Sequence, residues 1–194
     1  MKVISLDVLL KSDLISSEES RKLIAKYAAH PWLTVQEIIK LDLPARSRIE
    51  ALLQSEFLTD SQLRELACDF AEHTLHIFED HAPEEWRPHK CVEAARTYLT
   101  GATSLEDLQA AIKDAIPVVW KFEGTEFISA FEAGLVVTFL DYKDAAEMVR
   151  LIARRTQSAS HHRVMESSMS SVQPMVSGEG EAEWQLGQIM KKLC

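Results

Sequence analysis

A group of histidines lies close together in the middle of the chain and raises the question of a metal site. His73 and His76 are three residues apart on a stretch with helical periodicity. Zinc is held by about four nitrogen, sulfur or oxygen ligands at close to 2 Å. The residues that could complete such a set are Cys68, Glu72, His81 and His89. The spacing matches no metal motif such as HExxH, and histidines at this spacing on an amphipathic helix are more often solvated boundary residues. A metal-dependent hydrolase using His73, His76 and a nearby carboxylate is therefore an alternative hypothesis.

The other residues that could do chemistry indicate no particular reaction. His161 and His162 lie among arginines, where they resemble an exposed helix end with cations suited to the helix dipole. Cys68 and Cys91 fall on apolar helix faces, where cysteine behaves as a small inert hydrophobe. The sequence contains no GxSxG, GxxxxGK[ST] or GxGxxG motif. We predict that the protein is not an enzyme and uses no cofactor.

An acidic turn around Trp86 is the better candidate for function. Pro83 and Pro88 bound it, and its carboxylates are Glu79, Asp80, Glu84 and Glu85. An aromatic side chain among carboxylates is a plausible anchor for a basic protein partner. The alternative is that Trp86 packs inward and the carboxylates form a solvated loop.

Composition narrows the classes of partner. The 194-residue chain has a formal net charge of −9 and a sequence pI near 5.3. Binding to duplex nucleic acid requires cationic side chains at phosphates, so direct nucleic-acid binding is disfavoured, whereas a basic protein partner suits this charge. Three cysteines without CxxC spacing indicate a reducing compartment. No apolar run approaches the ~20 residues of a membrane span, so we predict a cytoplasmic protein that does not enter a membrane.

The elements that must position these residues are helices. Capping-box patterns mark several expected starts: Ser16 with Glu19, Thr34 with Glu37, Thr59 with Gln62, and Thr103 with Glu106. Apolar residues recur at helical spacing from Leu63 to Phe78, and a further stripe ends at Gly101. Pro117 is expected to end or kink the helix that follows. The sequence predicts an all-α fold of stacked antiparallel helices in a single compact bundle-like domain.

The same patterns divide the chain into four parts. Residues 1–55 are expected to form a semi-independent N-terminal helical layer, and residues 56–166 the main helical domain. Residues 167–180 are rich in Ser and Gly and indicate a flexible linker. Residues 181–194 are predicted to form a C-terminal helix that packs back on the domain. Between residues 126 and 156 we expect two helices divided near Asp141.

Residues 43–111 and 183–185 resemble a helical family of putative immunity proteins that occur beside bacterial toxin genes and in phage genomes. The residues that carry the resemblance are Leu43-Pro44, Arg48-Ile49, Leu66-Ala67-Cys68, Phe70-Ala71-Glu72, Phe78-Glu79, Arg87-Pro88, Val92 to Arg96, Tyr98, Gly101 and Glu183-Trp184-Gln185. Most of them have the character of structural residues. Arg87 is expected to pair with Glu93 across the turn, and Arg96 with a carboxylate on the preceding helix.

The resemblance implies a non-enzymatic inhibitor that binds another protein and blocks it. Together with the charge, it suggests a basic target, either a toxin or a host defence protein disabled by a phage. We predict that Glu79, Asp80, Glu84, Glu85 and Trp86 contact this partner. The alternatives are the metal-dependent hydrolase and an oligomeric structural or assembly protein. The oligomeric state itself does not follow from the sequence.

Overall fold

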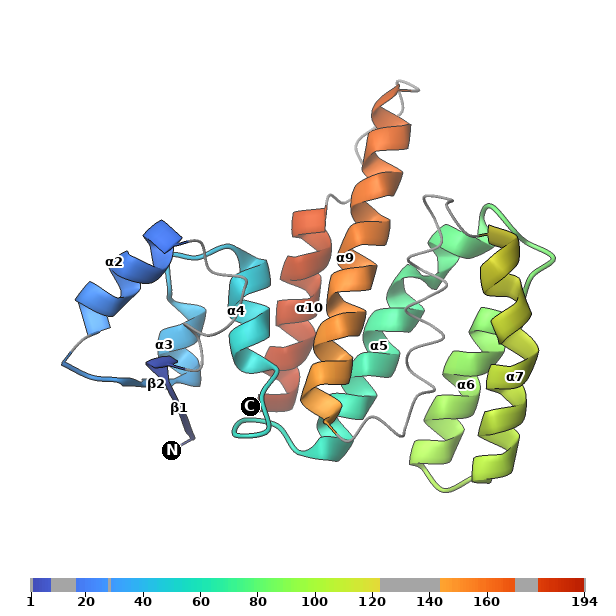
Figure 1. The fold of residues 1–194 in the computed structure, drawn as a ribbon, viewed down its shortest axis with the longest axis horizontal. Coiled ribbons are helices and arrows are strands. Elements are labelled where there is room, and N and C mark those ends of the chain that lie inside the picture. The colour runs from blue at the N-terminus through green and yellow to red at the C-terminus, as the bar shows by residue number, and fades with distance from the viewer. Residues whose placement is uncertain (1, 8–16, 28, 123–143, 170–177, 194) are drawn as a thin grey trace.

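The fold is known from a computed structural model that describes residues 2–7, 17–27, 29–122, 144–169 and 178–193. Helices lie side by side across most of the molecule, and one small sheet lies at the N-terminal end (Figure 1). The all-α prediction is confirmed. Several neighbouring helices alternate in direction, whereas α5 (Asp60–Glu79) and α9 (Ala145–Met169) run the same way, as do α4 (Ala45–Leu52) and α10 (Gly178–Leu193).

The N-terminal part contains a feature that the sequence did not predict. Strands β1 (Val3–Ser5) and β2 (Trp32–Thr34) form an antiparallel pair in which Ile4 lies opposite Leu33. Both of these side chains are buried, at 1% and 0% exposure. Strands of three residues are too short to show an alternating pattern. The helices of this part are α2 (Ser17–Tyr27), α3 (Val35–Ile39) and α4 (Ala45–Leu52).

The helix starts follow the expected capping chemistry with one shift. Thr34 and Thr59 each cap a helix through a complete capping box, with Glu37 and Gln62 as the partners. Helix α7 (Leu105–Phe122) is capped by Ser104 and Asp107 instead of the predicted Thr103 and Glu106. In both pairs the two residues are three positions apart, as a capping box requires, so the sequence alone does not decide whether α7 is capped at residue 103 or 104.

Helix ends agree less closely with the expectations. Helix α6 (Arg87–Leu99) ends before Gly101, which has a positive φ of 73° and supplies the predicted stop. Helix α7 does not end at Pro117 but continues to Phe122. Helix α9 extends to Met169 and α10 (Gly178–Leu193) begins at Gly178, so helices occupy both ends of the predicted linker. The expected helix before Asp141 lies outside the described residues.

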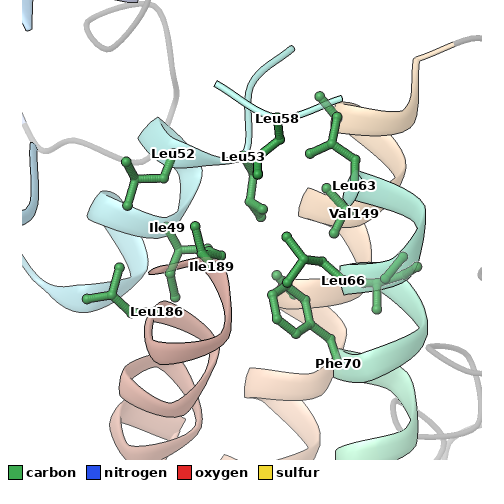
Figure 2. Packing of buried hydrophobic residues seen from close by; sticks show 14 of the residues in the cluster. Ile49, Leu52, Leu53, Leu58, Leu63, Leu66, Phe70, Val149, Leu186 and Ile189 are labelled. Atoms are coloured by element: carbon green, nitrogen blue, oxygen red, sulfur yellow. The ribbon is translucent and has the colours of Figure 1, made fainter. Parts of the chain in front are cut away.

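One continuous core joins the N-terminal part to the rest of the molecule. The close-up in Figure 2 shows Ile49 of α4 near Ile189 of α10, and Leu66 and Phe70 of α5 on the other side of the same apolar region. A second cluster lies beneath α5, α6 and α7 and includes Phe78, Cys91 and Val118. Buried side chains before and after position 55 therefore belong to one core. A semi-independent N-terminal layer that ends at residue 55 stays a prediction.

Helix α10 holds three neighbouring helices with three consecutive side chains. Glu183 pairs with Arg48 of α4 at 2.9 Å. The Trp184 ring stacks on His73 of α5, with ring centroids 3.6 Å apart. Gln185 points to α9. Successive residues of an α-helix project about 100° apart, so one turn can face three separate neighbours.

The Gln185 amide is fully buried and hydrogen-bonded on both sides. Its Nε2 donates to Thr156 Oγ1 at 2.6 Å and to Glu181 Oε1 at 2.9 Å, and its Oε1 accepts from Gln157 Nε2 at 2.8 Å. Glu181 is itself 1% exposed and its other oxygen lies 2.8 Å from His73 Nδ1. Buried polar groups are stable only when their partners are present, so this network fixes how α9 and α10 pack.

We predict that Gln185→Ala lowers the free energy of unfolding by about 1–3 kcal/mol, because it leaves Thr156, Gln157 and Glu181 with a lost buried partner. Chemical denaturation followed by circular dichroism measures this change. Gln188→Ala on the same helix is the matched control, since Gln188 is only partly buried and bonds to exposed Lys191. Equal stabilities of the two variants would show that the network does not hold α10 in place.

Candidate functional site

The acidic turn joins the end of α5 to the start of α6 and presents its tryptophan to solvent. Trp86 immediately precedes α6 and has 59% of its surface exposed. The alternative in which Trp86 packs inward is therefore wrong. Ala82 and Pro88 are buried at the two ends of this short segment, and Ala82 belongs to the second core cluster. The turn holds an apolar ring in water without support from the core, as expected of a contact residue.

Glu85 differs from the other predicted contact residues because it is buried, at 7% exposure. Arg87 donates hydrogen bonds to both of its carboxylate oxygens through Nε and Nη2. These bonds hold the pKa of Glu85 below its ordinary value, although burial acts in the opposite direction. The expected pair of Arg87 with Glu93 is wrong, because a carboxylate two residues away within the turn reaches the guanidinium first.

The remaining members of the turn are accessible. Asp80 and Glu84 are exposed, and Glu79 pairs with His89 at 3.2 Å while its side chain stays 41% exposed. The Nζ atom of Lys90 lies 5.0 Å from the centroid of the Trp86 ring. A cation over an indole face limits the orientations of the ring. The structure thus keeps four of the five predicted residues at or near the surface and gives Glu85 a structural role.

A groove continues from this turn along the boundary between α6 and α7. It has a volume of about 400 Å³, and Lys90, the residue that covers Trp86, lines one end of it. Three carboxylates line the groove: Glu93 from α6, and Asp107 and Asp114 from α7. The floor contains small residues, among them Ala94 and Ala111. We call Trp86 together with this groove the acidic face.

Local contacts fix the geometry of the acidic face. Arg87 Nη1 lies 3.4 Å from the carbonyl oxygen of Asp114, and the Cys91 thiol donates to the carbonyl of Ala111 at 3.5 Å. Asp107 accepts from the backbone N–H and the hydroxyl of Ser104 at the start of α7. These bonds cross from α6 to α7 or stiffen the turn between them. The carboxylates are therefore held on a rigid pair of helices.

Sequence reasoning missed the groove, although part of its signal was present. Asp107 and Asp114 are seven residues apart, which places them on the same face of a helix. Glu93 was assigned to an internal ion pair and so was not counted as a surface charge. The contact between α6 and α7, which brings the three carboxylates together, could not be deduced from either helix alone.

The histidines of the metal hypothesis have other contacts. His73 stacks on Trp184 and bonds to Glu181, and His76 Nδ1 lies 2.9 Å from the carbonyl oxygen of His73. No three His, Cys, Asp or Glu side chains are grouped to hold a metal ion in the part of the chain that the structure describes. Burial raises the pKa of both Cys68 and Cys91 to about 12, so neither thiol is an activated nucleophile. Arg96 reaches Asp69 and Glu72 on α5, as predicted.

Among the described helices, none combines the length and the apolar character that a transmembrane span requires. The described residues form a helical protein in which Trp86 is exposed and a groove nearby is lined by three carboxylates. Residues 54–118 match the family model described as Imm-5 like putative immunity protein. This segment contains α5, α6 and most of α7, and so the whole acidic face. No curated protein and no solved structure matches the chain.

The match agrees with the family that the sequence resembles, over a shifted range. Residues 43–53 and 183–185 lie outside the matched segment. The structure nevertheless connects them, since Arg48 in the first range pairs with Glu183 in the second. An immunity protein binds another protein and inhibits it, so the match suggests an inhibitory role for this chain.

We predict that Glu85→Gln destabilises the protein at neutral pH by about 1–3 kcal/mol through the weakened bonds from Arg87. The folded-state pKa of Glu85 is lowered, so its contribution is present above the unfolded pKa of about 4.3 and is lost as the pH falls through the folded value. Denaturant unfolding at pH 7 and roughly pH 3 measures both effects. Glu84→Gln, which changes an exposed neighbour, is the control and should leave the free energy of unfolding nearly unchanged. If Glu85→Gln lowers the free energy of unfolding as much at the lower pH as at pH 7, the pairing of ionised Glu85 with Arg87 is not the source of the effect.

Proposed function

We propose that this protein is a non-enzymatic inhibitor that binds a basic protein toxin and blocks it with the acidic face. The observation that carries the proposal is an exposed tryptophan beside Lys90, which lines a groove together with three carboxylates, inside the segment that matches an immunity family. Interface hot spots are enriched in tryptophan that becomes desolvated on binding. Trp86 supplies such an anchor, and the groove beside it supplies complementary charge.

Two contributions to binding follow from this arrangement. Glu93, Asp107 and Asp114 attract cationic side chains, which raises the rate of encounter and orients the partner. Burial of the Trp86 ring then supplies affinity that salt does not screen. Because α6 and α7 are rigidly joined, the surface needs little reordering on binding. The inhibitor occludes the cationic region of its target and requires no reaction of its own.

A basic target is the partner that this surface favours. Toxins that act on nucleic acids carry cationic clefts, and an acidic protein that fills such a cleft competes with the phosphates of the substrate. A phage protein that disables a basic host defence protein would use the same physical principle. The identity of the bound protein separates these two roles, and the immunity family match favours the first.

We predict that the protein restores growth to cells that express the candidate toxin encoded beside its gene, and that Trp86→Ala abolishes this protection. The loss of a central aromatic anchor costs about 2 kcal/mol or more, which is roughly a thirtyfold weaker complex. Trp32→Ala is a matched control because Trp32, on β2, is also 59% exposed but lies outside the acidic face. Calorimetry with the purified toxin tests the affinity directly. Equal loss or equal retention of protection by the two variants would refute the role of Trp86.

The groove is tested separately through its salt dependence. We expect the association rate to fall steeply as ionic strength rises, and Glu93→Gln with Asp114→Asn to reduce both the rate and this dependence. Stopped-flow or surface-based kinetics measures the association and dissociation rates. The control is Glu56→Gln with Glu147→Gln, which removes the same number of charges from exposed sites elsewhere. If both double variants slow association equally, the net charge and not the groove directs the encounter.

A further inference from the structure

A second cleft lies at the opposite side of the core, where α4, α9 and α10 meet. It has a volume of about 550 Å³. Its polar wall comes largely from one face of α9, where Arg154, Gln157, Ser158 and His161 follow each other at helical spacing. Arg46, in the first turn of α4, completes this wall. Helices α4 and α10 both begin at this end of the molecule (Figure 1).

The side chains of the cleft give it a cationic character within a chain of net charge −9. Two guanidinium groups, an imidazole, an amide and a hydroxyl line it, and none of the lining residues is acidic. The cleft is therefore a cationic site in a chain whose net charge is negative.

The positive charge of the cleft is only partly balanced inside the fold. Glu50 is 6% exposed and lies 3.7 Å from Arg150 and 3.6 Å from Arg154, and Arg46 adds to the field at its carboxylate. Three arginines thus surround one carboxylate. Arg154 approaches Glu50 through Nε, and its terminal nitrogens make no hydrogen bond with a residue that the structure describes. Arg46 has no hydrogen bond or ion pair with any residue that the structure describes.

The size and the remaining walls of the cleft indicate what kind of anion fits. Small-molecule sites have volumes of about 300–1,000 Å³ and combine apolar walls with a few placed polar groups. Pro44, Ala45 and Ala182 supply the apolar wall here. Arginine forks match the oxygen geometry of phosphate, and hydroxyl and imidazole donors add further hydrogen bonds. A phosphate group alone would leave much of this volume empty.

We propose that this cleft binds a small phosphate ester, with Arg46 and Arg154 holding the phosphate group and the organic part lying against the apolar wall. Ser158 and Gln157 donate further hydrogen bonds to the ligand. The bound anion balances the excess of arginines and joins α4 to α9. This site is independent of the proposed inhibitory function, since it lies on α4, α9 and α10 and the acidic face lies on α6 and α7.

Isothermal titration calorimetry at constant ionic strength tests the proposal with three probes: ribose 5-phosphate, inorganic phosphate and ribose. We expect saturable binding of the phosphate ester, weaker binding of inorganic phosphate, and no binding of ribose. Tighter binding of inorganic phosphate than of the ester would show that the cleft takes a free anion, and would overturn the assignment to an ester.

Variants place the binding in the cleft. Arg46→Gln should weaken binding of ribose 5-phosphate at least about tenfold, since it removes a charged donor. Arg46 is exposed and bonds to no described residue, so circular dichroism should show an unchanged fold. Arg64→Gln is the control, because Arg64 pairs with Asp60 on α5 away from the cleft. The proposal fails if no phosphate probe binds, if Arg46→Gln binds like the unmodified protein, or if Arg64→Gln weakens binding equally.

Discussion

The packing of α10 against three other helices is the constraint on which the rest of the structure depends. Its central turn directs Glu183 to α4, Trp184 to α5 and Gln185 to α9. The Gln185 amide can be buried only where its partners on α9 already lie in place, and the indole can stack only where His73 is held. The C-terminal helix therefore specifies the relative positions of segments far apart in the sequence. Without it, α4 would lose the helix with which it has its most extensive contact.

This arrangement separates the helices packed around α10 from α6 and α7, which carry the acidic face. Helix α5 lies between them, with Phe70 and His73 facing α10 and Phe78 facing the cluster beneath α6 and α7. Helices α6 and α7 consequently pack on only one side of α5 and present their other faces outward (Figure 1). The acidic face occupies these helices. A rigid support behind a surface lowers the entropy cost of forming a complex, so in the proposed function the scaffold contributes to binding without touching the partner.

The sequence predicted local features well and spatial ones poorly. The capping boxes at Thr34 and Thr59 and the stop at Gly101 depend on neighbours within a few residues, and they are confirmed. The reach of Arg96 to α5 is a contact between two helices, and it is the one predicted contact of this kind that is confirmed. The sheet of β1 and β2 was missed because neither strand is long enough to show its period. Pro117 was expected to interrupt α7, yet the helix continues, since packing of Ala115 and Val118 outweighs one lost backbone hydrogen bond. The groove between α6 and α7 was invisible because it exists only when two helices meet.

Charge is distributed over this molecule in a way that net charge alone does not describe. Glu93, Asp107 and Asp114 line the groove between α6 and α7 together with one cation, Lys90. Arg46 and Arg154 line the cleft where α4, α9 and α10 meet, on the other side of α5. The linings of the groove and of the cleft therefore differ in the sign of their charge, which the net charge of −9 does not show. In the function proposed above, a basic partner is attracted to the acidic face, while the cationic cleft repels it from the opposite side. Attraction at one surface and repulsion at another give orientation as well as speed, which an evenly distributed negative charge could not supply.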